Sequence, residues 1–186
     1  MRTPIPRRTP SGHADAVGVI VALLDRYPQI ATLNSDPLDG SVTLSFAIAG
    51  GLDATIEREL RETLGDHVRG LLALMRDEPD RLTVVVDADP ELSFVRLTRD
   101  ARSLTREELS MTAVLLEARF GDRLVRSAPA AVTDPGEDPA AQDEVVEYAL
   151  DALRDPASPR SLVGFREEMR VVVYVVRRKK RTRARS

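Results

Sequence analysis

Residues 29–48 read QIATLNSDPLDGSVTLSFAI. Two segments of strand-forming residues, 29–34 and 41–48, flank SDPLDG, whose Asp-Pro and Asp-Gly pairs are typical of turns. The sequence therefore predicts a β-hairpin here. Hairpins build antiparallel sheets, which are often covered by helices on one face only, so this stretch indicates an α+β protein.

On both sides of this hairpin, helical and extended patterns alternate along the chain. Apolar residues at helical spacing predict helices within 11–27, 49–77, 104–122 and 141–155. Runs of strand formers predict further strands within 81–86, 91–98, 122–129 and 168–176, with loops at 130–140 and 156–164. We therefore expect a two-layer α+β sandwich of mostly antiparallel sheet with about four helices.

Two of the expected helices begin with recognisable capping residues. Asp53 is placed to cap the helix within 49–77. Thr105 and Glu108 have the spacing of a capping box, and Leu104 and Leu109 occupy the positions of a hydrophobic staple. These signals indicate where the second and third helices start.

Segments 23–37 and 115–129 follow a common plan of helix end, strand and proline. LLDRYPQIATLNSDP and LLEARFGDRLVRSAP match without gaps at Leu, Leu, Ser and Pro. An internal α–β repeat would explain the match. The alternative is that helix-to-strand junctions resemble one another in any protein.

The length of 186 residues and the hydrophobic content of 42% fit one domain, or two small repeats that share a core. We expect a domain at 12–176 between a flexible basic, Pro-rich arm at 1–11 and a flexible Arg/Lys-rich tail at 177–186. The absence of cysteine excludes disulfides and thiolate chemistry. Because no signal-like segment and no run of about 20 apolar residues is present, we expect a cytoplasmic protein without a membrane span.

Charge is distributed unevenly along the chain. The formal net charge is −3, but residues 12–176 contain 17 basic and 30 acidic residues, a net charge of −13. The arm carries three positive charges and the tail seven, and neither contains an acid. An acidic partner would therefore be attracted to the two ends of the chain and repelled by residues 12–176.

The basic tail has several interpretations. It could bind nucleic-acid phosphates, an anionic lipid or another acidic partner, or the acidic surface of the protein itself. It lacks the aromatic residues of base-stacking modules. The interpretation that we favour is that the tail's charges keep the preceding strand, VVVYVV, from aggregating. The candidate binding residues are Arg177, Arg178, Lys179, Lys180, Arg181, Arg183 and Arg185.

The last expected strand is apolar on both faces. A strand with one solvated face should alternate apolar and polar residues, whereas residues 171–176 are all Val or Tyr. Either the strand is central in the sheet and covered on both sides, or its second face meets another subunit. Val172, Tyr174 and Val176 are therefore candidate interface residues, and a homodimer is one expected outcome.

Three motifs could bind a phosphate, a divalent cation or an anion, but each has a simpler structural explanation. AGGLD at 49–53 faintly resembles a phosphate-binding loop, yet it lacks the usual glycine spacing, and Asp53 would repel a phosphate. Asp87, Asp89 and Glu91 could hold a divalent cation, but Pro90 favours a hairpin turn. In GFREEMR at 164–170, Arg166 could reach an anion, or the loop could simply form internal ion pairs.

The two histidines do not indicate catalysis. His13 lies near the start of the first expected helix, and His67 lies at the edge of an apolar helical stripe. Asp66 is adjacent to His67 in sequence, but neighbouring helical residues point apart. No known catalytic or metal-binding spacing is present, so we expect no catalytic residue, no metal site and no cofactor.

From the sequence, we expect a non-catalytic interaction, assembly or regulatory module. The alternative is a nucleic-acid-associated protein that uses its basic termini. A metal-dependent enzyme is the least favoured alternative.

Overall fold

The computed structural model describes residues 16–126, 139–154, 160–167 and 170–176. Its helices are α1 (Ala16–Arg26), α2 (Ala54–Leu74), α3 (Arg106–Phe120), the short 3-10 helix η1 (Gly121–Arg123) and α4 (Pro139–Arg154). Its strands are β1 (Thr32–Asp36), β2 (Ser41–Ala49), β3 (Leu82–Asp87), β4 (Leu92–Asp100), β5 (Ser161–Glu167) and β6 (Arg170–Val176). The expected basic arm at 1–11, His13 and the tail at 177–186 lie outside the described residues.

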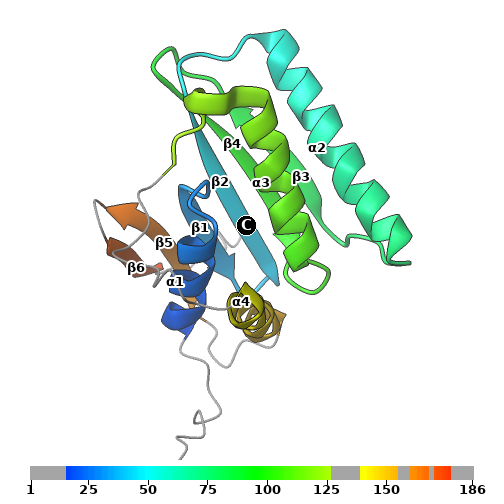
Figure 1. Ribbon diagram of the computed structural model, residues 1–186, viewed down its shortest axis with the longest axis vertical. Coiled ribbons are helices and arrows are strands. Elements are labelled where there is room, and N and C mark those ends of the chain that lie inside the picture. Colours follow the sequence, from blue (N-terminus) through cyan, green and yellow to red (C-terminus); the bar gives the residue numbers. More distant parts are fainter. Residues whose placement is uncertain (1–15, 127–138, 155–159, 168–169, 177–186) are drawn as a thin grey trace, which may run out of the picture.

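The six strands form one sheet in the order β3-β4-β2-β1-β5-β6, and every pairing in it is antiparallel. The predicted hairpin at 29–48 is confirmed as β1 and β2, which pair from Thr32 with Ser45 to Asp36 with Ser41. Figure 1 shows the helices gathered in front of the sheet, with α2 beside β3 and with β5 and β6 at the opposite edge. The expected α+β fold with mostly antiparallel strands is therefore confirmed.

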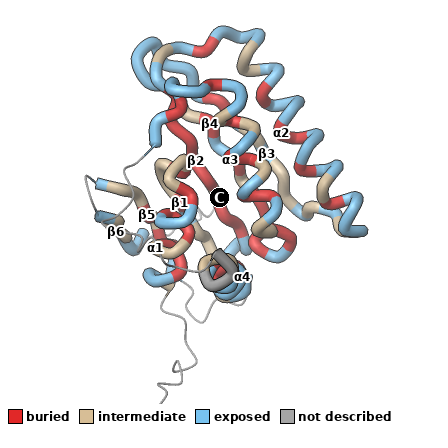
Figure 2. Tube along the Cα trace, viewed as in Figure 1, coloured by how far each residue is buried: buried red, intermediate tan, exposed pale blue. Residues whose placement is uncertain are grey.

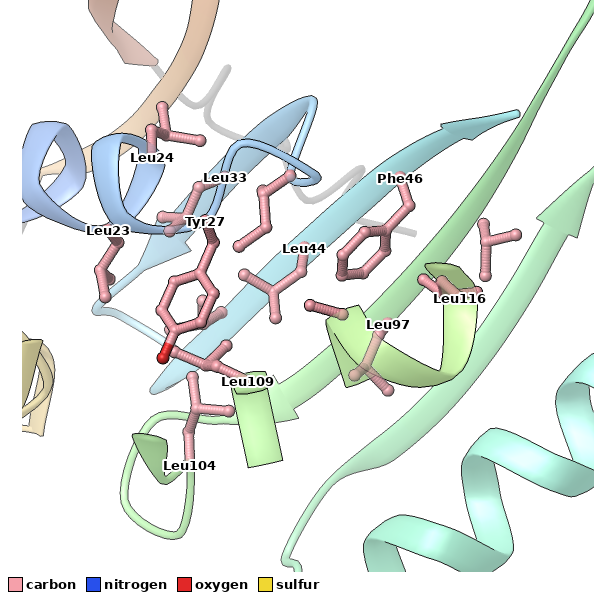
Figure 3. Close-up of a cluster of buried hydrophobic side chains, with 14 of the residues drawn as sticks. Leu23, Leu24, Tyr27, Leu33, Leu44, Phe46, Leu97, Leu104, Leu109 and Leu116 are labelled. Carbon is pink, nitrogen blue, oxygen red and sulfur yellow. The ribbon is translucent and has the colours of Figure 1, made fainter. Parts of the chain in front are cut away.

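Strand register separates the sheet into a helix-covered face and an open face. Leu44 of β2 lies opposite Leu33 of β1 and Leu97 of β4, so these three side chains point to the same face. All three are almost fully buried, together with residues from α1 and α3 (Figure 3). Figure 2 shows the buried residues following β2 through the middle of the molecule. The core therefore lies between the helices and one face of the sheet.

Both predicted N-caps, Asp53 and Thr105, are confirmed, but the predicted capping box of Thr105 and Glu108 is wrong. Asp53 accepts hydrogen bonds from the backbone N–H groups of Thr55 and Ile56, at 2.9 and 2.8 Å. Thr105 accepts one from the N–H of Glu108 at 3.2 Å. Glu108 does not complete a capping box, because its carboxylate points inward and binds Arg99. Both staple residues, Leu104 and Leu109, are buried (Figure 3).

Two local predictions are wrong. Residues 161–164 belong to β5 rather than to a loop, and the strand continues through Glu167 into the segment that we expected to be a charged turn. The strand expected at 122–129 is instead the 3-10 helix η1 followed by a single bridge between Leu124 and Ile48, as far as residue 126. As far as residue 126, the matched segments 23–37 and 115–129 thus differ in structure, since the first contains the paired strand β1 and the second a single bridge.

Candidate interaction surface

β6 forms one edge of the sheet. It pairs with β5 from Ser161 with Val176 to Glu167 with Arg170, and no described strand pairs with its other side. Of the two alternatives for this strand, a central position covered on both faces is therefore wrong. An edge strand presents a row of N–H and C=O groups that a further strand could use.

The apolar character of β6 leaves large side chains in water. Tyr174 is 56% exposed, Val175 51% and Val176 42%. The first half of the strand is better covered, because Val171 and Val173 pack against the core under the helical layer. The C-terminal half of β6 is thus an apolar edge on both faces of the sheet.

On the open face, β5 extends this apolar surface inward. We call the set Val163, Phe165, Val172, Tyr174 and Val176 the β5–β6 strip, since its members point away from the helices by register. The rings of Phe165 and Tyr174 stack at 5.7 Å between centroids. Val163, Phe165 and Val172 are half-buried. The strip unites all three sequence-predicted interface residues with two from β5.

Next to the strip, the open face is polar. Thr43 of β2 and Thr98 of β4 lie opposite each other there and share a hydrogen bond of 3.0 Å between their hydroxyls. Asn34 of β1 is exposed on the same face. Exposed apolar side chains recur on this face in β3 and β4, where Val85 is 37% and Leu92 38% exposed, so polar residues separate the β5–β6 strip from these.

The other edge of the sheet, β3, has a different character. Residues on its open face include Thr83 and Asp87, and Asp87 forms an ion pair with Arg96 of β4. Figure 1 shows α2 running beside this strand. Charged side chains and covering helices are devices that keep edge strands from pairing with other chains. β3 carries such devices, whereas residues 171–176 of β6 contain no charge.

α1 holds β5 in place through a close contact and an ion pair. A Cβ at Gly164 would lie 2.2 Å from Cγ2 of Ile20, so the helix rests directly on the strand backbone. Arg166, whose side chain is almost fully buried, donates to the backbone carbonyl of Leu24 at 2.6 Å and to Asp25 at 2.8 Å. Of the two alternatives for Arg166, binding to an outside anion or an ion pair within the chain, the structure has the ion pair, with Asp25 of α1.

The acidic side chains at the turn of the β3–β4 hairpin form contacts within the hairpin itself. Asp89 accepts a hydrogen bond from the backbone N–H of Glu91 at 3.0 Å, and Asp87 binds Arg96. Among the residues that the structure describes, no group of three His, Asp or Glu side chains is arranged to hold a metal ion. Asp53 caps α2, as described above, instead of lining a phosphate site.

His67 lies on the exposed face of α2. Its Nδ1 is 2.7 Å from the backbone carbonyl of Thr63, one turn earlier in the same helix. The neighbouring Asp66 forms an ion pair with Arg69. The structure does not bring His67 and Asp66 together.

None of the described helices is long and apolar enough to cross a membrane.

A buried ionic cluster joins the end of β4 to the start of α3. Arg99, which is fully buried, donates to both carboxylate oxygens of Glu108 at 2.7 and 3.0 Å and to Asp100 at 2.6 Å. Its remaining N–H groups bind the carbonyl of Arg81 and the hydroxyl of Ser103. A guanidinium has five N–H donors, and all five are engaged here, so Arg99 has a structural role.

The two carboxylates of this cluster have pKa values displaced in opposite directions. Burial would raise the pKa of Asp100, but hydrogen bonds from Ser103, Arg81 and Arg99 outweigh it and hold the pKa well below its usual range. Burial dominates at Glu108 and raises its pKa, although Arg99 opposes the shift. Asp100 is therefore ionised in ordinary buffers.

Sequence analysis missed the contribution of β5. Leu162, Val163 and Phe165 are apolar residues, interrupted by Gly164, a short run that is consistent with a strand. Gly164 and the preceding Pro/Ser-rich segment 156–160 concealed that pattern, because both favour loops. This short apolar run was the signal that could have predicted β5 and thereby added Val163 and Phe165 to the surface.

Comparison of the chain with protein-family models, with curated proteins and with solved structures found no match. Its function must therefore be inferred from the geometry of the molecule itself.

Proposed function

We propose that this protein is a non-catalytic interaction and assembly module that binds a protein partner through the free edge of β6 and the β5–β6 strip. One observation carries the proposal: an edge strand with six consecutive apolar residues, half of them exposed. The proposal includes a cytoplasmic location, which the cysteine-free composition fits.

Strand addition is the binding mode that this surface favours. A partner strand would satisfy the outer N–H and C=O groups of β6, while the side chains beside them would supply apolar contacts. Exposed aromatic residues are enriched at protein interfaces, and the stacked pair of Tyr174 and Phe165 provides a rigid apolar anchor. The contrast with the charged β3 edge supports β6 as the side that pairs.

Photo-crosslinking in cells that produce the full chain tests this proposal. A photoreactive amino acid at Tyr174 should give a discrete adduct with another polypeptide. The matched control is Tyr148 of α4, which is 53% exposed and lies away from β6. If the probe at Tyr174 gives no more adduct than the probe at Tyr148, the proposal is wrong.

A charge placed on the strand edge should abolish the adduct. Val175→Lys puts an ammonium where a partner strand would exclude water, whereas Val145→Lys makes the same change at an equally exposed valine of α4. Both variants should keep their thermal stability within about 0.5 kcal/mol, because exposed substitutions usually do. Loss of the Tyr174 adduct in the first variant alone is the expected result, and equal adducts in both would contradict the proposal.

A further inference from the structure

We propose that the partner on β6 is a second copy of this chain, paired antiparallel in the register that sets Val173 opposite Val173 of the second copy. This inference rests on the proposed function, because it names the partner of the same edge. It follows from the strand's length, its side-chain pattern and the charges that flank it.

Strand geometry restricts the pairing to a few registers. Residues directly opposite each other in an antiparallel pair point to the same face of the sheet. In a symmetric dimer, one residue of the strand must therefore lie opposite the same residue of the second copy, with the twofold axis midway between them. β6 spans Arg170–Val176, and its midpoint is Val173. Only the axis at Val173 aligns all seven residues of the strand with those of the copy, which gives the longest hydrogen-bonded ladder.

This register brings apolar side chains together on both faces. On the helix-covered face, Val171 would lie opposite Val175 of the second copy, which would cover a valine that is half exposed in the single chain. On the open face, Val172 would lie opposite Tyr174 of the second copy. Cross-strand pairs of aromatic and β-branched residues are among the most stabilising in sheets.

The twofold axis would also make the two β5–β6 strips continuous. Val172 pairs with Phe165 within the chain, and Tyr174 pairs diagonally with Phe165 through ring stacking. A row across the dimer would therefore contain Phe165 and Val172 of one chain, followed by Tyr174 and Val163 of the other. Val172 and Tyr174 of each strip would be buried against those of the second copy, whereas Val176 would lie opposite Arg170 of the second copy.

Charge favours the antiparallel over the parallel arrangement. Seven positive charges follow Val176 in the sequence. Antiparallel pairing places the two Val176 residues at opposite ends of the ladder, about 20 Å apart for a strand of this length. Parallel pairing would set them side by side, within the screening length of about 8 Å at physiological salt. Only the antiparallel dimer keeps the two Val176 residues, after which the basic residues follow in sequence, apart.

The absence of cysteine makes the register directly testable. A single substitution introduces the only thiol of the chain, and opposite residues of an antiparallel pair lie within reach of a disulfide. In oxidising buffer, purified full-length Val173→Cys should form a disulfide dimer by itself. A mixture of Val172→Cys and Tyr174→Cys chains should form the mixed dimer faster than either chain alone.

The control is Val114→Cys on the exposed surface of α3. Paired thiols have a local concentration of about 1 mM, so at about 10 μM protein the expected rate is about a hundredfold above this control. The mixed pair on the open face keeps the test valid if Val173→Cys does not fold, as judged by its melting curve. Rates equal to the Val114→Cys control would overturn the inference, and a dominant Tyr174→Cys homodimer would overturn the register.

The two proposals fail separately. If the purified chain does not crosslink through β6, but the probe at Tyr174 still joins a different polypeptide in cells, the interaction module stands and the second copy is wrong. If neither experiment gives a product, both are wrong.

Discussion

Asp100 and Arg99 show how single residues secure this fold. The Arg99 guanidinium lies in the interior, where an unpaired charge would be very costly, and Asp100 and Glu108 supply its counter-charges. Asp100 also accepts hydrogen bonds from the backbone N–H groups of Arg81 and Ser103. The cluster thereby joins the segment before β3, the end of β4 and the start of α3.

Replacing Asp100 with Asn should lower the free energy of unfolding by about 1–3 kcal/mol near neutral pH, the scale of losing hydrogen bonds to a charged group. Since the folded-state pKa of Asp100 is lowered, its contribution is complete above the unfolded pKa of about 3.9 and is lost as the pH falls below that value. Urea unfolding at neutral and acidic pH should show the difference between wild type and variant shrinking towards low pH. A difference that does not change with pH would contradict this account.

The contact between α1 and β5 decides how the helical layer meets the interaction edge. Gly164 lets Ile20 and Leu24 lie against the strand backbone, and Arg166 fixes the end of the helix. The same helix contacts β6, whose Val171 and Val173 pack against the core. The position of β6 therefore depends on this packing.

Gly164→Ala should destabilise the protein by about 1–3 kcal/mol, the usual cost of overfilling a packed interior. The new Cβ would meet Cγ2 of Ile20 at 2.2 Å and Cδ1 of Leu24 at 3.1 Å. The matched control is Gly70→Ala in α2, where the added methyl meets no atom within 4 Å and should stabilise the helix by up to about 1 kcal/mol. Thermal melts that rank the two variants in the opposite order would show that α1 moves aside at no cost.

At the scale of the whole molecule, the uneven charge raises the question of what the basic tail does. The tail lies outside the described residues, but its sequence joins directly to β6. Charges that flank an aggregation-prone strand oppose uncontrolled pairing whatever their sign, whereas binding to phosphates requires positive charge. Reversing the sign of the tail's charges therefore distinguishes protection of the strand from binding to phosphates.

Deletion of residues 177–186 should increase light scattering over time, because the exposed β6 edge loses its flanking charges. A chain in which the seven basic residues of the tail are replaced by Glu should stay as soluble as wild type if the tail protects the strand. If the tail serves nucleic acid, both changes should abolish salt-sensitive binding to RNA that the intact chain shows. Unchanged scattering on deletion would remove the protective role.

The sequence alone determined the elements whose signals are local. The turn residues of SDPLDG, the caps Asp53 and Thr105, and the apolar spacing of the helices act within a few residues of one another. They gave the β1–β2 hairpin, the starts of α2 and α3, and the antiparallel α+β class. The sequence also showed that residues 171–176 are apolar on both faces, which is why Val172, Tyr174 and Val176 could be named in advance.

Only the tertiary structure decided which neighbours these elements have. The backbone groups that pair strands are the same in every residue, so the pattern of one strand cannot say whether it lies at the centre or the edge of a sheet. The placement of β6 at the edge, the pairing of β5 between β1 and β6, and the capture of Glu108 by Arg99 all depend on contacts between residues distant in sequence. Those contacts form only when the whole chain packs, and they set the surface on which the proposed assembly depends.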